Sequence, residues 1–138
     1  DFVCDMTKIL TAHYTYLNNL VITEMSAMRF LHDGGFEILG RYFLVAAHAL
    51  SEFRMVDVGE NKLVRLIQTG PTPHPGRGAN FIDQKFIPVC GTSHEGDQAV
   101  SLITTDPEKH CPYVWNGVPS LVGQGDRSQI IRTLPNSK

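Results

Sequence analysis

Short apolar segments separated by turn residues run through most of the chain after Leu20. They are rich in β-branched and aromatic side chains, which is the pattern of strands. Residues such as Gly59-Glu60-Asn61 have the composition of the turns between them. The pattern predicts strands, weaker in the tail, at residues 20–31 (one strand or two joined by a bend), 36–39, 42–47, 53–58, 62–68, 81–89, 98–105, 112–115, 120–123 and 129–134.

The stretch before Leu20 has a different pattern. Its apolar side chains recur at three- and four-residue intervals over residues 5–17, with Asp5 as a possible N-cap and Asn18-Asn19 as a stop. That period is typical of an amphipathic helix. The sequence therefore predicts an N-terminal helix, with His13 as a packed residue on its apolar face.

Two stretches of the chain have the composition of turns or loops. Residues 32–35, "HDGG", predict a turn or bulge, and residues 69–80, "TGPTPHPGRGAN", contain three prolines and three glycines. Proline removes a backbone donor, so residues 69–80 are expected to form an exposed loop outside any sheet. His74, within it, is then predicted to be a surface residue.

Many short strands without helical patterns between them favour a mainly β fold, an antiparallel barrel or sandwich. We find no internal repeat in the sequence. At 138 residues, with 42% hydrophobic and 19% charged residues, the chain has the size and composition of one globular domain.

Charge and composition exclude some classes of function. A net charge of −2 without basic clusters gives no reason to expect nucleic acid or an acidic membrane as partner, and no apolar run is long enough to span a bilayer. No signal-peptide pattern is visible, and three unpaired cysteines suggest reduced thiols in a cytoplasmic protein. The six histidines lack metal-site spacing, so neither a metal nor a cofactor is predicted.

One histidine, His48, ends the apolar stretch "YFLVAAHAL". It is either a core residue bonded to a backbone carbonyl or a general base. A base needs a carboxylate to orient it, and Asp97 in "EGDQAVSLI" precedes an apolar strand where such a group could be held. Asp57, Glu60 and Asp83 are alternative acids, but Asp57 and Glu60 adjoin Gly59 at what reads as a solvated hairpin tip.

These segments resemble those of chymotrypsin-fold proteases. "LVAAHAL" is similar to the strand ending in the catalytic histidine, "GDQAVSLI" to the segment carrying the catalytic aspartate, and "DGGFEILGRYFLVAAH" to the approach through Gly-Gly. Ala49 and Asp33 stand where secreted members carry a disulfide, so an intracellular branch is implied. With the N-terminal helix, the resemblance is closest to the viral 3C-like cysteine proteases.

The resemblance implies an antiparallel β-barrel of the chymotrypsin-like type with an N-terminal α-helix. Its implied divisions are a helix over residues 1–19, a first barrel over 20–110 and, over 111–138, a linker with the possible start of a second barrel. The implied function is an endopeptidase that processes a viral polyprotein in the host cell cytoplasm. His48 would be the general base and acid, and Asp97 would orient it.

The nucleophile is the missing part of this reading. The family's Gly-x-Ser/Cys-Gly-Gly stretch is absent, and Cys90, Cys111 and Ser128 fit it poorly. The substrate would be a peptide or polyprotein, RNA binding is weakly supported, no membrane is involved, and the oligomeric state is not predicted. The alternative is a catalytically inactive β-barrel for binding or assembly, viral or cellular; a His/Asp metal-dependent hydrolase lacks a third ligand.

Overall fold

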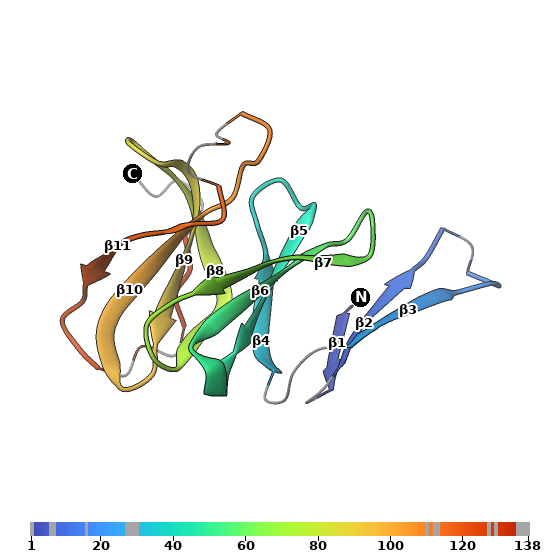
Figure 1. Ribbon diagram of the computed structural model, residues 1–138, viewed down its shortest axis with the longest axis horizontal. Coiled ribbons are helices and arrows are strands. Elements are labelled where there is room, and N and C mark those ends of the chain that lie inside the picture. Colours follow the sequence, from blue (N-terminus) through green and yellow to red (C-terminus); the bar gives the residue numbers. More distant parts are fainter. Residues whose placement is uncertain are drawn as a thin grey trace.

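The computed structural model describes residues 2–5, 8–15, 17–26, 31–109, 111, 114–126, 128 and 130–134. Over these residues the chain forms three antiparallel sheets in succession (Figure 1). The first contains β1 (Phe2–Asp5), β2 (Lys8–His13) and β3 (Val21–Ser26). The second contains β4 (Leu31–Phe36), β5 (Tyr42–Ala47), β6 (Glu52–Asp57) and β7 (Lys62–Gln68), with a 3-10 turn, η1 (His48–Leu50), after β5. The third contains β8 (Pro73–Asp83), β9 (Ile87–His94), β10 (Asp97–Thr104) and β11 (Gly117–Val122).

Within each sheet, every strand pairs with the next strand along the chain. The predicted mainly β, antiparallel class is therefore confirmed, but the chymotrypsin-like barrel is wrong. A barrel requires the sheet to close on itself, whereas β4 and β7 are the two edges of one open four-stranded sheet, and β8 and β11 are those of the next.

The predicted N-terminal helix is also wrong. Residues 8–13 form the middle strand of the first sheet, paired with β1 and β3. Ile9 and Thr11 are buried on one face, while the residues between them are half-buried. Because Ile9 and Leu10 also fit a helical stripe, the sequence alone does not separate a strand from a helix here. Pairing with the neighbouring strands decides in favour of the strand. The division of the chain into domains at residues 19 and 110 stays a prediction.

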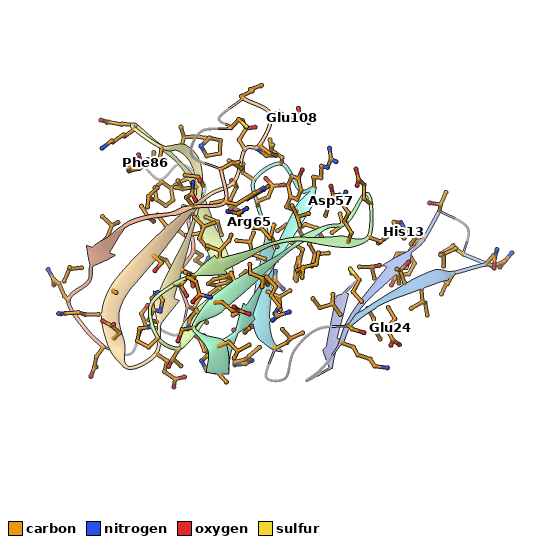
Figure 2. The ribbon with its side chains drawn as sticks, viewed as in Figure 1. His13, Glu24, Asp57, Arg65, Phe86 and Glu108 are labelled. Atoms are coloured by element: carbon orange, nitrogen blue, oxygen red, sulfur yellow. The ribbon has the colours of Figure 1, made fainter. Side chains whose placement is uncertain are left out.

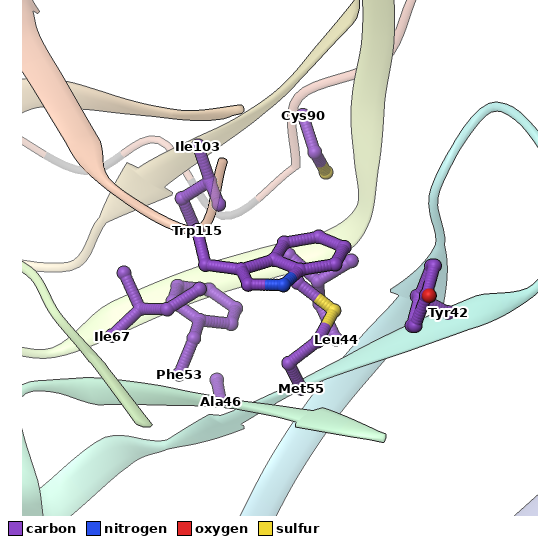
Figure 3. Close-up of a cluster of buried hydrophobic side chains, with 9 residues drawn as sticks. All are labelled: Tyr42, Leu44, Ala46, Phe53, Met55, Ile67, Cys90, Ile103 and Trp115. Carbon is purple, nitrogen blue, oxygen red and sulfur yellow. The ribbon is translucent and has the colours of Figure 1, made fainter. Parts of the chain in front are cut away.

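The two central strands of the second sheet, β5 and β6, are buried on both faces. One face packs on the first sheet, where Val45, Ala47 and Val56 meet Ile9 of β2. The other packs on the third sheet, where Leu44, Ala46, Phe53, Met55 and Ile67 meet Cys90, Ile103 and Trp115 (Figure 3). A strand buried on both sides needs apolar residues at successive positions, which explains the unbroken run "YFLVAA".

Acidic side chains close several of the hairpins. Asp57 accepts hydrogen bonds from the backbone N–H groups of Gly59 and Glu60 at 2.9 and 3.1 Å, and Asp106 makes the equivalent pair of bonds after β10. Asp57 was predicted to be solvated, but it is only 2% exposed. Its second oxygen accepts hydrogen bonds from the Arg41 guanidinium at 2.9 and 3.1 Å.

The second and third sheets repeat one unit. β5 begins at Tyr42 and β9 at Ile87, while β6 begins at Glu52 and β10 at Asp97, so both steps are 45 residues (87 − 42 and 97 − 52). That period is typical of four-stranded repeats. The expectation of no internal repeat is therefore wrong, because the repeat lies in strand spacing and turn chemistry rather than in identical letters. No described segment forms a helix with the length and apolarity needed to cross a bilayer.

We predict that Asp57→Asn lowers the free energy of unfolding by about 2 kcal/mol, because it removes a buried charge that accepts hydrogen bonds from Arg41 and two backbone groups. Burial raises the pKa of Asp57, but those hydrogen bonds outweigh it and hold the pKa below the ordinary 3.8. The ionised group therefore stabilises the fold above pH 3.8, and this contribution is lost as pH falls through the folded-state pKa.

Urea unfolding at several pH values measures the effect. Glu60→Gln is the matched control, since its half-exposed carboxylate lies 3.7 Å from Arg41 and its loss should cost less than about 0.5 kcal/mol. Equal destabilisation by the two variants at neutral pH would contradict the role given to Asp57.

Candidate functional site

Three histidines from three different elements meet at one end of the second and third sheets. His32 belongs to β4, His48 to η1 and His74 to β8. The ring centroids of His32 and His74 are 4.9 Å apart, and the His48 ring lies 5.3 Å from His32 and 5.6 Å from His74, all edge to face. We call these three residues the histidine cluster.

A β-bulge places the first of them. The pairing of β4 with β5 shifts register between His32 and Gly34, and Asp33, at the shift, has a positive φ of 57°. An extra residue of this kind bends the strand and re-aims the side chains beside it. The prediction of a turn or bulge at residues 32–35 is confirmed as a bulge inside a strand.

His74 lies before a similar irregularity in the next sheet. The pairing of β8 with β9 shifts between His74 and Ala79, and the skipped segment contains Gly76 and Gly78 at positive φ. The two histidines, 42 residues apart (74 − 32), therefore occupy matching places on the first strands of successive sheets. A side-chain bond from Asn80 Nδ2 to the carbonyl of Phe36, at 2.8 Å, joins these strands.

The predicted exposed loop over residues 69–80 is wrong from Pro73 onward. Proline is tolerated there because β8 is the edge strand of its sheet, where an unpaired N–H is not missed. The His74 side chain is only 14% exposed, so it is not the surface residue expected. The prolines correctly indicate that strand pairing is interrupted here, but they do not indicate that the side chains are exposed to solvent.

Two carboxylates flank the histidine cluster. Asp33 Oδ2 lies 3.5 Å from His74 Nδ1, and Glu95 Oε2 lies 3.8 Å from His48 Nε2. Ligand-type atoms of His32, Asp33 and His74 all lie within 4.8 Å of one another. The arrangement can hold and exchange protons, and it can surround a small anion when its imidazoles are protonated.

The imidazole of His48 is partly buried, with 25% of its side chain exposed against 14% for His74. Its Nε2 atom is buried and makes no hydrogen bond. Burial lowers the pKa of His48, and the neighbouring His32 and His74 lower it further, against the opposing influence of Glu95 and Asp33. Burial and the two neighbouring histidines therefore favour the neutral form of His48, in which one ring nitrogen can accept a proton.

A cavity of about 550 Å³ opens beside the cluster. Its walls combine His74 and Asp33 with two arginines, Arg77 and Arg132, and with two isoleucines, Ile130 and Ile131. Guanidinium groups bind carboxylates and other oxyanions, and isoleucines offer an apolar surface. The lining suits a molecule that combines acidic groups with an apolar part.

A fourth histidine supports the segment that leads to this cavity. His94 is fully buried, with Nδ1 2.7 Å from the carbonyl of Pro71 and Nε2 2.8 Å from Ser101 Oγ. Its ring also packs against Gly70, where a Cβ would lie 3.2 Å from it. Glu95, the next residue, is exposed, whereas the buried His94 fixes the chain just before His74.

The predicted pair of His48 and Asp97 is not brought together. Asp97 Oδ1 accepts the backbone N–H of Ala99 at 3.0 Å, closing its own turn, and His48 Nε2 has no hydrogen-bond partner. The acid nearest to His48 is Glu95, two residues earlier in the same turn. A catalytic role for His48 or Asp97 stays a prediction, but the hydrogen bond expected between them is not formed.

Successive four-stranded antiparallel sheets packed face to face, with a polar site at their first strands, define a protein of the blade-repeat class. The chain matches the model of the "Cytochrome D1 heme domain" over residues 2–138. It is 43% identical over 136 residues to a nitrite reductase of Stutzerimonas stutzeri, covering 95% of this chain and 24% of that protein. The chain belongs to the cytochrome d1 heme domain family.

Solved structures share the fold at low sequence identity. The dihydro-heme d1 dehydrogenase NirN in complex with DHE has a TM-score of 0.75 and 17% identity, covering 96% of this chain and 27% of that one. The Kuenenia stuttgartiensis hydrazine synthase has a TM-score of 0.71 and 13% identity, covering 94% and 34%.

The family overturns the protease reading. The resemblance to chymotrypsin-fold and viral 3C-like proteases was wrong, as were the endopeptidase activity and the peptide or polyprotein substrate. The matching segments are short β patterns that unrelated sheets share. The useful signal was a different one: two histidines, each followed by a glycine-containing segment, at the 42-residue spacing of a sheet repeat.

We predict that Gly35→Ala disturbs the site through the backbone. A Cβ at Gly35 would collide with the carbonyl of Arg77, where β4 and β8 approach most closely. The strands would have to separate, at a cost of about 2 kcal/mol in the free energy of unfolding. Gly125→Ala, with nothing within 4 Å of its Cβ, is the control and should leave stability unchanged. Equal melting temperatures for the two variants would refute the close-approach argument.

Proposed function

We propose that this chain forms part of the heme-binding and nitrite-reducing region of an oxidoreductase. The observation that carries the proposal is the pairing of His32 and His74 beside a cavity lined by two arginines, in a chain 43% identical to a nitrite reductase. The chain spans 24% of that relative's length, so it would supply one part of the binding site and the rest of the protein the others.

The cavity lining fits a heme. Its carboxylate substituents would bind the guanidinium groups of Arg77 and Arg132, and its ring would contact the apolar side chains of Ile130 and Ile131. When bound, the heme supplies the redox-active iron that passes an electron to the substrate. The sequence predicts no cofactor, because the residues that would bind the heme come from distant parts of the chain.

The histidines would supply the protons that the reduction of nitrite consumes. Removing one oxygen from nitrite takes two protons and one electron and yields nitric oxide and water. Two imidazoles in contact can hold two protons next to the departing oxygen, and their charge also favours binding of the nitrite anion. Asp33, whose Oδ2 lies 3.5 Å from His74 Nδ1, would help to orient that imidazole.

A propeller is the architecture that we propose for the complete domain. The first sheet exposes apolar side chains such as Val21 and Ile22, and the last exposes Leu121 and Val122. Further sheets packed on both sides would cover these faces, and the first strands of all sheets would line a common centre. The cytoplasmic location stays a prediction, and its host-cell form has no support once the viral assignment is dropped.

We expect His32→Ala and His74→Ala, made in the full-length heme-loaded protein, each to lower kcat for nitrite by about 100-fold, because each removes a proton donor. Steady-state assays with a chemical electron donor measure this, and the absorption spectrum checks that heme is retained. His13→Ala, at the far end of β2 (Figure 2), is the control and should keep full activity. Retained activity in both cluster variants would rule out this chemistry.

We expect Arg77→Gln and Arg132→Gln to weaken heme binding by about 10-fold each, the loss of one charge-assisted bond to a carboxylate. Titration of the heme-free protein with heme, followed by absorbance, gives the affinities. Arg65→Gln, an exposed arginine on β7 outside the cavity (Figure 2), should bind heme as the parent does. Unchanged affinity in both cavity variants would exclude them as the carboxylate-binding groups.

A further inference from the structure

His74 is the member of the histidine cluster that lines the cavity, and His48 lies outside that lining, as His32 does. His48 sits in η1, directly after β5, and its ring contacts the rings of both His32 and His74. Its side chain is 25% exposed, yet its Nε2 atom is buried without a hydrogen bond. An unpaired buried nitrogen costs stability, so its presence calls for a role that needs it free.

The group facing that nitrogen is a carboxylate with access to solvent. Glu95, in the turn between β9 and β10, places Oε2 3.8 Å from His48 Nε2, and its side chain is 45% exposed. A small rotation of this exposed side chain brings the two atoms within hydrogen-bonding distance. Glu95, His48 and the pair of His32 and His74 thus lie next to one another between an exposed carboxylate and the cavity, and His32 is itself exposed in this chain.

We propose that Glu95 and His48 form a path that carries protons from solvent to His32 and His74. The proposal rests on the proposed function, in which each turnover consumes two protons from that pair. A proton bound at Glu95 passes to Nε2 of neutral His48, the opposite ring nitrogen releases a proton toward His32 or His74, and His48 returns to its neutral form. No electron moves in these steps, and His48 acts only through the other two histidines.

All charged neighbours of His48 are consistent with such a path. His32 and Asp33 face it from β4, His74 from β8 and Glu95 from the turn before β10. The two histidines and burial disfavour a lasting charge on His48, so a proton that reaches it is passed on. Asp33, beside His74 and 35% exposed, is the competing entry point.

The test uses the full-length heme-loaded protein with His48→Gln, Glu95→Gln and, as rival, Asp33→Asn. We expect the first two to lower kcat for nitrite about 10-fold with KM unchanged, most strongly at high pH where protons are scarce. A small acid such as acetic acid should restore part of the rate in Glu95→Gln. Glu108→Gln, at a more exposed carboxylate elsewhere (Figure 2), should match the parent. Unchanged kcat in Glu95→Gln, or a loss confined to Asp33→Asn, would overturn the path.

A second measurement does not depend on activity. Histidine ring carbons labelled with ¹³C report the titration of His48, whose signal is identified by its loss in His48→Gln. Glu95→Gln should lower the midpoint of that titration, because the carboxylate favours the charged imidazole, and Glu108→Gln should not move it. A midpoint that ignores Glu95→Gln overturns the path.

The two measurements also separate this inference from the proposed function. If the parent protein binds heme but does not reduce nitrite, the proposed function fails. The link between Glu95 and His48 then stands or falls on the titration alone.

Discussion

The close approach of β4 to β8 is the constraint on which the site depends. Gly35 allows it, because any side chain there would collide with the Arg77 carbonyl. With the strands in contact, a bulge at Asp33 and the interrupted pairing after His74 turn two imidazoles from different sheets toward each other. The distance of 4.9 Å between their rings is thus a property of backbone geometry rather than of one local motif.

The rigidity of that arrangement comes from the sheet behind it. β5 and β6 are buried on both faces, so the second sheet cannot slide against either neighbour without opening apolar contacts. His94 adds a polar tie by bonding the Pro71 carbonyl and Ser101 at once. A site that must hold imidazoles in contact needs this support, since small shifts would separate them.

Much of the strand pattern could be predicted from the sequence, and the failures have physical causes. Residues 42–47 and 62–68 are strands as expected, because their apolar runs reflect burial in a sheet. Residues 5–17 were expected to be helical because a short stripe satisfies two periods at once, and only pairing partners distant in sequence decide between them. Residues 69–80 are expected to form a loop because proline cannot pair in the middle of a sheet. The position of β8 at a sheet edge, where proline is tolerated, is visible only in the structure.

The candidate site was harder to predict, since its members contact one another only across sheets. His48 is a polar residue in an apolar run, and it does belong to the cluster, but Asp97, its partner in the protease reading, begins β10 and accepts a hydrogen bond from the backbone N–H of Ala99. His32 and His74 carry no local motif, and they become a pair only when the 42-residue step between β4 and β8 is recognised. In a protein built from repeated sheets, residues at matching positions converge on one place, so the spacing between repeats is a stronger guide to function than similarity within any single segment.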